Sequence, residues 1–363
     1  MRSDPTPHRR AYVDWARGLA VLLMIEAHTL DAWTRPISRV GRSYAYATIL
    51  GGFAAPLFLW LAGVGVALSA ASVWRRTGSR GKAIDAICRR GLELFILAFL
   101  FRLQGFVVTP GSYPVMLFRV DILNIMGPAI VAAGLVWGLT SRPAALVAAY
   151  AALACAVAMV TPLVRTWPLV DRLPIGTQWY LRPSGDYTAF TLFPWIGFVF
   201  AGAACGVVLA GARDSAGERR VHLGLLAAGV AVLGAGVWTM SRPAIYAHSS
   251  FWTSSPTYFA IRVGILTTAL AVLYAAGRAA ERHGVRLAAL ERLGQSSLFV
   301  YWIHVELVYG YTTWPIRHRL PLWGTAIACA LFSVLMYAAV GWRDQVVEWW
   351  RARRLYRTKN IAV

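Results

Sequence analysis

The first long apolar segment of the chain, residues 11–33, carries several ionisable side chains, which a plain membrane anchor would lack. Its sequence, AYVDWARGLAVLLMIEAHTLDAW, is long enough for a helix that crosses a bilayer. At about 100° per residue, one side of that helix presents Asp14, Arg17, His28 and Asp31. Because burying a charge at membrane depth costs several kcal/mol, this polar stripe must face other helices or a wet cavity. It is the first candidate for a functional site.

The composition indicates that the rest of the chain also lies in a membrane. Of 363 residues, 58% are hydrophobic and only 14% are charged, which is too apolar for an ordinary soluble domain. We therefore expect an all-α fold, a polytopic membrane protein with about ten transmembrane helices around a polar cavity. We expect a single domain over 1–345 and a basic cytoplasmic tail over 346–363. The predicted spans lie near residues 11–33, 48–72, 84–105, 120–139, 143–163, 190–211, 221–240, 256–280, 293–313 and 321–342.

The lysines and arginines that give the chain its net charge of +20 lie largely in the loops between these spans. Basic segments such as WRRTGSRGK alternate with longer, aromatic and Pro-rich connections such as VVTPGSYPVMLF. The positive-inside rule then predicts a multi-pass protein of the cell membrane with both termini cytoplasmic. The lipid bilayer is the expected partner, no nucleic-acid module is present, and the oligomeric state, including a homodimer, is left open. The tail, with Trp349 and Trp350 among its arginines, is interpreted either as a segment lying along the inner leaflet with its arginines on lipid phosphates or as an ordinary basic extension.

Neither a metal site nor a nucleophile motif is indicated. The sequence contains no G-x-S-x-G, H-E-x-x-H or P-loop pattern, and Gly63 and Gly65 fit close helix packing better than phosphate binding. The cysteines lie in or beside apolar segments without metal-ligand spacing, so neither disulfides nor a metal is expected: Cys88, Cys155, Cys205 and Cys329.

His28 and Asp31 are three residues apart and can share a helix face. The carboxylate could fix the imidazole tautomer and leave the other ring nitrogen as a general base. The alternative is a structural pair that closes the helix end. Arg17 lies about 16 Å from His28 along the helix axis, so with the N-terminus inside, Asp14 and Arg17 are near the cytoplasm and His28 is in the outer half.

Other predicted spans add ionisable groups at membrane depth. Helix pairing or snorkelling can explain each one alone, whereas together they predict the polar cavity. They are Arg89, Arg90, Glu93, Arg102, Arg119, Asp121, Asn124, Arg262, His304 and Glu306. Aromatic side chains in the outer connections either stack on sugar rings or form an interfacial belt: Trp167, Trp179, Tyr180, Tyr187 and Trp252.

Several segments, in order along the chain, resemble the transmembrane acyltransferase superfamily. Residues 9–33 resemble its opening helix, with Arg9, Asp14, Arg17 and Gly18 matching. FAAPLFLWLAGVGVALSAASVWRR, LFRVDILNIMG and LGQSSLFVYWIHVEL are similar to its later segments. The nearest branch is the one that includes heparan-α-glucosaminide N-acetyltransferase and bacterial membrane proteins.

The resemblance implies an enzyme that moves an acyl group, usually acetyl, from cytoplasmic acyl-CoA to an extracytoplasmic glycan, another carbohydrate or a small-molecule acceptor, on oxygen or nitrogen. His28 would be the base or transient acyl carrier, with Asp31 orienting it. Asp14, Arg17, Arg89 and Arg90 would lie on the acetyl-CoA side, where Arg suits phosphate. The acceptor candidates are Arg119, Asp121, Asn124, Arg262, His304 and Glu306.

The chain departs from its lysosomal relative at His28, where that enzyme has Asn. The relative's own catalytic His aligns some ten residues downstream, near Arg39, where this chain has no His. The alternative function is a transporter or channel that uses the same polar cavity; inverted repeats would favour it, and none is found. A non-catalytic scaffold is disfavoured because it would bury these charges without use.

Overall fold

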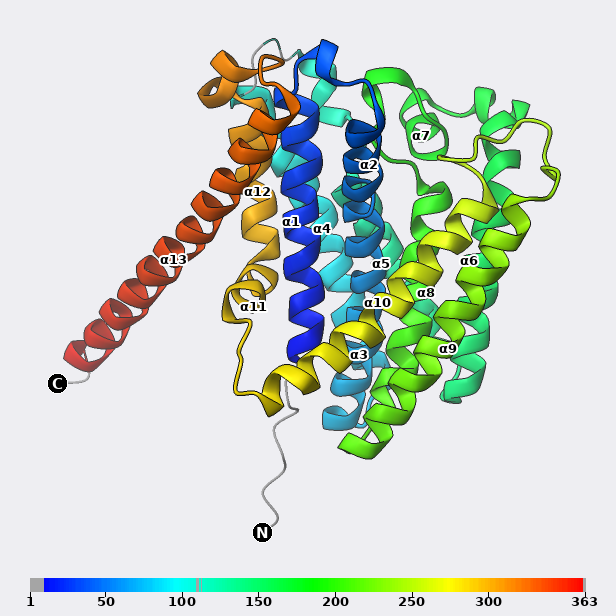
Figure 1. Cartoon of the computed structure of the whole chain (residues 1–363). Coiled ribbons are helices and arrows are strands. Elements are labelled where there is room, and N and C mark those ends of the chain that lie inside the picture. Colours follow the sequence, from blue (N-terminus) through cyan, green and yellow to red (C-terminus); the bar gives the residue numbers. More distant parts are fainter. Residues whose placement is uncertain (1–9, 109–110, 112, 362–363) are drawn as a thin grey trace. The chain divides into compact units, whose positions relative to one another are not determined.

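The computed structural model describes residues 10–108, 111 and 113–361 (Figure 1). Regular structure there is helical throughout, and the described residues form isolated β-bridges but no strand. By its contacts the chain divides into two compact units, residues 1–54 with 286–363 and residues 55–285. Arg9 of the opening motif and the last two residues of the expected tail lie outside the described residues.

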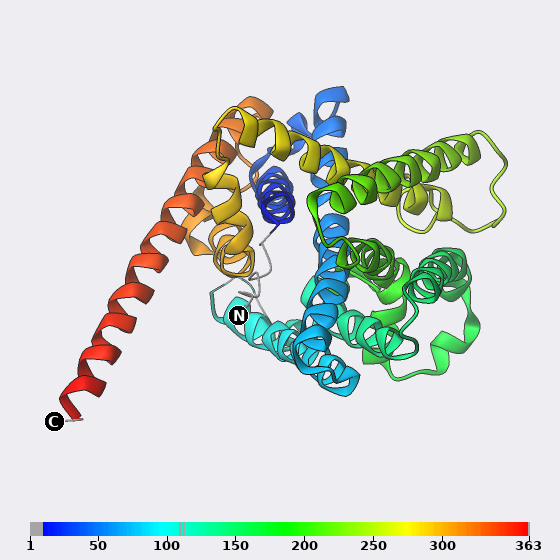
Figure 2. The same ribbon diagram turned by 90° about the horizontal axis from the view of Figure 1, so that it is seen from below.

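The first unit is arranged around α1 (Ala11–Trp33), which packs against four other helices. In both views α1 lies alongside the two short helices α11 and α12 (Figures 1 and 2). The backbone just after α1 is held by the segment before α13, since Arg35 N donates to Leu320 O at 2.9 Å and Leu320 N donates to Trp33 O at 2.9 Å. The remaining elements are η1 (Pro36–Ser38), α2 (Arg42–Gly51), α11 (Ala288–Gln295), α12 (Ser297–Tyr309), η5 (Tyr311–Ile316) and α13 (Leu322–Ile361).

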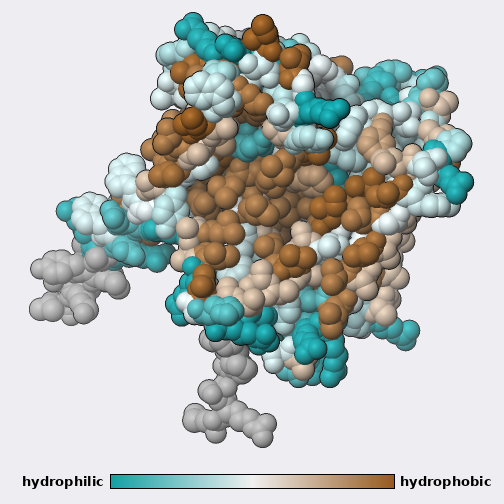
Figure 3. Space-filling model, in the orientation of Figure 1, coloured by the Kyte–Doolittle hydropathy of each residue, from teal (hydrophilic) through white to brown (hydrophobic). Residues whose placement is uncertain are grey.

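The second unit is built from packed helix pairs, α4 with α5, α6 with α8 and α9 with α10. Figure 3 shows apolar side chains along the visible face of α9 and α10 and hydrophilic ones near their ends, as expected for helices surrounded by lipid. Its elements are α3 (Ala54–Thr77), α4 (Arg80–Val108), η2 (Pro114–Phe118), α5 (Ile122–Gly138), α6 (Pro143–Thr166), η3 (Pro168–Arg172), α7 (Ile175–Leu181), η4 (Gly185–Tyr187), α8 (Leu192–Ala210), α9 (Ser215–Met240) and α10 (Pro256–Arg282).

The predicted fold class, an all-helical polytopic membrane protein, is confirmed. Seven helical segments of the described chain are long and apolar enough to span a membrane, and α5 and α12 are apolar but shorter. α1 has the length, 23 residues, but carries the ionisable stripe. The expected span near 48–72 lies within one of these seven segments, Arg42–Thr77, in which the helix breaks between the end of α2 at Gly51 and the start of α3 at Ala54.

The last helix is longer than a membrane requires. α13 has 40 residues, which corresponds to about 60 Å, roughly twice the thickness of a hydrocarbon core. Residues 346–361 therefore extend the final span as one continuous helix rather than beginning a separate element. That this end lies at the cytoplasmic leaflet stays a prediction.

Small residues let α3 and α8 approach closely. A Cβ on Gly63 would lie 1.9 Å from the carbonyl oxygen of Val199, and one on Gly202 would lie 1.8 Å from that of Trp60. Both distances are far below van der Waals contact, so only glycine permits this spacing. This agrees with the prediction that Gly63 serves helix packing, since lipid-embedded helices associate through close van der Waals contact at small residues.

Gly202→Ala is expected to destabilise the protein by about 1–3 kcal/mol, because the new methyl group meets backbone and not a side chain that can rotate away. The matched control is Gly234→Ala on α9, where a Cβ meets nothing within 4 Å. That change should be neutral or stabilising by about 0.5–1 kcal/mol. The measurement is thermal unfolding in detergent, followed by fluorescence-detected size exclusion. Equal unfolding temperatures for the two variants would contradict the close-packing interpretation.

Candidate active site

His28 and Asp31, near the end of α1, are connected through a third side chain. Tyr309 is the last residue of α12. Its hydroxyl donates to Oδ2 of Asp31 at 2.8 Å and lies 3.0 Å from Nδ1 of His28. The two rings meet edge to face, with centroids 5.5 Å apart. The expected His–Asp pair is thus connected through Tyr309, with the hydroxyl between the imidazole and the carboxylate.

The directions of these hydrogen bonds determine the tautomer of His28. A tyrosine hydroxyl has one hydrogen, and in this geometry that hydrogen is used in the bond to Asp31. The hydroxyl oxygen is then an acceptor for His28, so Nδ1 carries the proton of the neutral imidazole. Consequently Nε2 of His28 keeps its lone pair, which is the state that a general base or nucleophile requires.

A second histidine lies against the first. His304 is fully buried, and its ring centroid is 5.2 Å from that of His28. Its Nδ1 lies 2.9 Å from the carbonyl oxygens of both Val300 and Tyr301, and since both are acceptors, Nδ1 must donate. Nε2 of His304 is therefore unprotonated in the neutral ring, and this buried atom has no hydrogen-bond partner among the described residues.

Arg39 joins Asp31 to a histidine from a distant part of the sequence. Its guanidinium lies 3.9 Å from the Asp31 carboxylate and donates to the Asp31 carbonyl at 2.5 Å. The same group lies 2.7 Å from Nδ1 of His318, which must accept and therefore carries its proton on Nε2. His318 has a left-handed backbone, φ 55°, and its amide donates to Ala32 at 2.9 Å. His318 thus contacts Arg39, although the sequence around Arg39 contains no histidine.

The side chains expected near the donor substrate are all in ion pairs. Arg17 lies 3.4 Å from Asp14, which is almost completely buried. In the second unit, Arg89 and Arg90 form exposed pairs along α4, at 2.9 Å and 3.1 Å from their carboxylate partners, Asp85 and Glu93. The arginines remain partly exposed, so a stronger anion can compete for them.

Three of the residues expected at the acceptor lie together at the start of α5. Asp121 is the N-cap of this helix and forms a capping box with Asn124, whose Oδ1 accepts from the Asp121 amide at 3.0 Å. The Asp121 carboxylate also forms an ion pair with Arg102 of α4. Arg119 precedes the cap, and its Nε is buried without a hydrogen-bond partner among the described residues. A structural role in capping α5 therefore accounts for much of this cluster.

The remaining acceptor candidates are on separate elements. Arg262 of α10 lies over the ring of Tyr258, 4.1 Å from its centroid, as a cation–π contact. Glu306 lies on α12, half-buried, and its backbone carbonyl accepts from Gly310 at 2.9 Å. Of the predicted set, His304 contacts His28 in the first unit, with ring centroids 5.2 Å apart.

The sequence analysis did not identify Tyr309 or His318. Each lies about 280 positions from its partner on or after α1, and no local spacing signals such a pairing. Tyr309 is also not on the same helix face as His304, because five residues correspond to about 140° around a helix. Only the packing of α12 on α1 brings it to the polar stripe.

A match to a protein-family model identifies the family of the chain. The model of the catalytic heparan-alpha-glucosaminide N-acetyltransferase family matches residues 9–236. This match covers more than half of the chain and includes α1 with His28 and Asp31 as well as the start of α5. No curated protein matches the chain. The chain belongs to the heparan-alpha-glucosaminide N-acetyltransferase catalytic family, a family of membrane acetyltransferases.

Proposed function

We propose that the protein transfers an acetyl group from cytoplasmic acetyl-CoA, or another short acyl group from its CoA ester, to an amine or hydroxyl of an extracytoplasmic glycan or related acceptor. His28 is the base or the transient acyl carrier. The observation that carries this proposal is the hydrogen-bonded chain from His28 through Tyr309 to Asp31, which leaves Nε2 with a lone pair.

Both chemical routes begin at Nε2 of His28. As a base, Nε2 takes a proton from the acceptor while the acceptor's nitrogen or oxygen attacks the acetyl carbonyl. As a carrier, Nε2 attacks that carbonyl itself, and the acceptor then displaces His28 from the acetyl-imidazole. In each route the C–S bond of acetyl-CoA breaks, one C–N or C–O bond to the acceptor forms, and the thiol leaves with one proton. Asp31, acting through Tyr309, stabilises the positive charge that develops on the imidazole.

The donor side is assigned to the opposite end of α1. Asp14 and Arg17 precede His28 by more than three helical turns, so with a cytoplasmic N-terminus they are at the side where CoA is available. We assign Arg17 to a phosphate of CoA, because guanidinium groups bind phosphate in two-pronged geometry, and Arg89 and Arg90 of α4 stay candidates for the same role. Asp14 holds Arg17 in place until the donor binds.

The acceptor side is assigned to His304 and, less directly, to the polar residues of the second unit. Nε2 of His304 is a buried acceptor with capacity for one donor, such as an acceptor-substrate N–H or O–H. The candidates for contacts to the rest of the acceptor remain Arg119, Asp121, Asn124, Arg262 and Glu306.

Tyr309→Phe should lower kcat roughly ten- to hundredfold while leaving the affinity for acetyl-CoA unchanged, because it removes a hydrogen bond to a charged group but keeps the ring. The assay is single-turnover acetyl transfer in nanodiscs with an amino-sugar acceptor. Tyr311→Phe, in the exposed η5 segment, is the matched control and should behave like the parent. Parent-like turnover of Tyr309→Phe would remove Tyr309 from the mechanism.

Substitutions can distinguish the role of His28, on α1, from that of His318, which contacts Arg39. His28→Ala should lower kcat at least about 10²-fold, the scale of a lost general base. His318→Ala should leave kcat close to the parent value, since His318 contacts Arg39 and not the relay. The reverse pattern, with activity lost only in His318→Ala, would transfer the chemical role to His318.

Acetyl-CoA binding, measured by calorimetry on the purified protein, tests the donor assignment. Arg17→Ala should weaken binding at least about tenfold, as expected for a lost hydrogen bond between charged groups. His28→Ala should retain binding of acetyl-CoA. Arg76→Ala removes an exposed arginine at the end of α3 and is the control for the loss of one positive charge. A folded parent protein that binds no acyl-CoA would favour the transporter alternative.

A further inference from the structure

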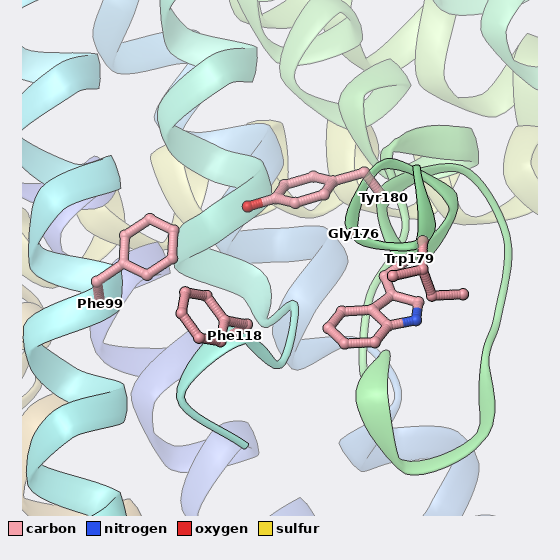
Figure 4. A pocket seen from close by; sticks show the side chains of 6 residues that line it. Phe99, Phe118, Gly176, Trp179 and Tyr180 are labelled. Atoms are coloured by element: carbon pink, nitrogen blue, oxygen red, sulfur yellow. The ribbon is translucent and has the colours of Figure 1, made fainter. Parts of the chain in front are cut away.

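The second unit contains an aromatic pocket with a volume of about 350 Å³ that none of the assignments above uses. In Figure 4 the rings of Phe99 and Phe118 lie on one side of it, and Trp179 and Tyr180 of α7 on the other. The lining residues are Phe99, Phe118, Ile175, Gly176, Trp179 and Tyr180. Their side chains carry only two polar atoms, the Trp179 indole nitrogen and the Tyr180 hydroxyl, so the pocket suits an apolar ligand.

The wall formed by α7 is held in place by neighbouring segments. Trp179 is 8% exposed and stacks on Tyr187, with ring centroids 4.9 Å apart and planes at 11°. The segment containing Tyr187 is joined to the start of α5, since Val120 N donates to Tyr187 O at 3.0 Å and Ala189 N donates to Val120 O at 2.9 Å. The pocket therefore exists before a ligand binds, which reduces the cost of ordering on binding.

The pocket is continuous with a lipid-facing surface of α4. Exposed apolar side chains recur on one face of this helix at a spacing of three or four residues: Leu92 55%, Ile96 60%, Phe99 36% and Leu103 52%. In a helix that spans a bilayer, such a face contacts hydrocarbon chains. Phe99 belongs both to this face and to the pocket, so the apolar lining of the pocket includes a side chain of the exposed face of α4.

Polar groups lie directly beside the apolar lining. Arg102, one turn after Phe99, forms its ion pair with Asp121, which is three residues after Phe118. The Tyr180 hydroxyl interacts with Asn124, and burial raises the pKa of Tyr180. An apolar pocket bordered by an ion pair and hydrogen-bonding groups matches a molecule with a hydrocarbon tail and a polar head.

We propose that this pocket holds the hydrocarbon chain of a membrane lipid, and that the acceptor of the acetyl group is a lipid-linked molecule. A free sugar fits less well, because most of its hydroxyl groups would lose hydrogen bonds to water, whereas the lining side chains offer only two polar atoms. The assignment of a lipid to the pocket stands independently, whereas its role as the acceptor rests on the function proposed above.

Gly176 provides a direct test. A Cβ at this position would meet nothing within 4 Å, so a side chain can begin there without a backbone clash, and Gly176→Leu adds apolar volume to the lining of the pocket. Gly224→Leu on α9, where a Cβ also meets nothing within 4 Å, is the matched control. The probe is a long-chain alcohol carrying a mid-chain diazirine, photolysed with the protein in nanodiscs, and its cross-links are mapped by mass spectrometry. We expect cross-links at residues 175–180 in the parent and in Gly224→Leu, and at least a fivefold loss in Gly176→Leu. Equal labelling of all three proteins would overturn the lipid site.

The acceptor role is tested by comparing two acceptors, a methyl glucosaminide and a decyl glucosaminide, with acetyl-CoA as donor. The decyl compound should have a kcat/KM at least about tenfold higher, since each buried methylene adds to binding. That advantage should disappear in Gly176→Leu and persist in Gly224→Leu. A Gly176→Leu defect with the methyl compound alone would assign the pocket to the sugar and overturn the proposal. Pocket cross-links in a protein that uses neither acceptor would leave the lipid site intact and contradict the proposed function instead.

Discussion

The arrangement of the first unit depends on the free-energy cost of burying ionisable side chains in an apolar helix bundle. α1 carries both carboxylates and cations in 23 residues, and their environments differ. Near its start, Asp14 is buried and paired with Arg17. Near its end, Asp31 is largely exposed and is the terminus of a relay from His28. One helix therefore has a paired, buried polar group at one end and a partly solvated one at the other, which suits the transfer across a membrane proposed above.

Much of this could be predicted from the sequence. Apolar segments of spanning length predicted the helical membrane fold, and the polar stripe at helical spacing predicted that His28 and Asp31 would be close to each other. The family resemblance agrees with the family match over residues 9–236. These features could be predicted because hydropathy and helix periodicity depend only on residues within about 20 positions of one another.

The features that could not be predicted all depend on packing between distant segments. Tyr309 reaches the end of α1 through the packing of α12 on α1, and His318 reaches it because the backbone of His318 and Leu320 is hydrogen-bonded to residues 32–35. The aromatic loop residues were expected either to stack on sugars or to form a belt. Both interpretations stay open, and neither included the stacked pair of Trp179 with Tyr187 that supports one wall of an apolar pocket. Sequence spacing gives no measure of such contacts.

The hydrogen bonds of the relay all point the same way. Nδ1 of His28 donates to the Tyr309 oxygen, and the Tyr309 hydroxyl donates to Asp31. When Nε2 of His28 takes up a proton, positive charge can therefore be relayed to Asp31 by two short transfers, from Nδ1 to Tyr309 and from Tyr309 to Asp31, with no side chain having to rotate. Asp31 is 63% exposed, so water is available at that end. In the proposed reaction the same three residues thus both prepare the base and connect it with water, and because the relay runs in both directions, a proton can return to His28 for the departing thiolate.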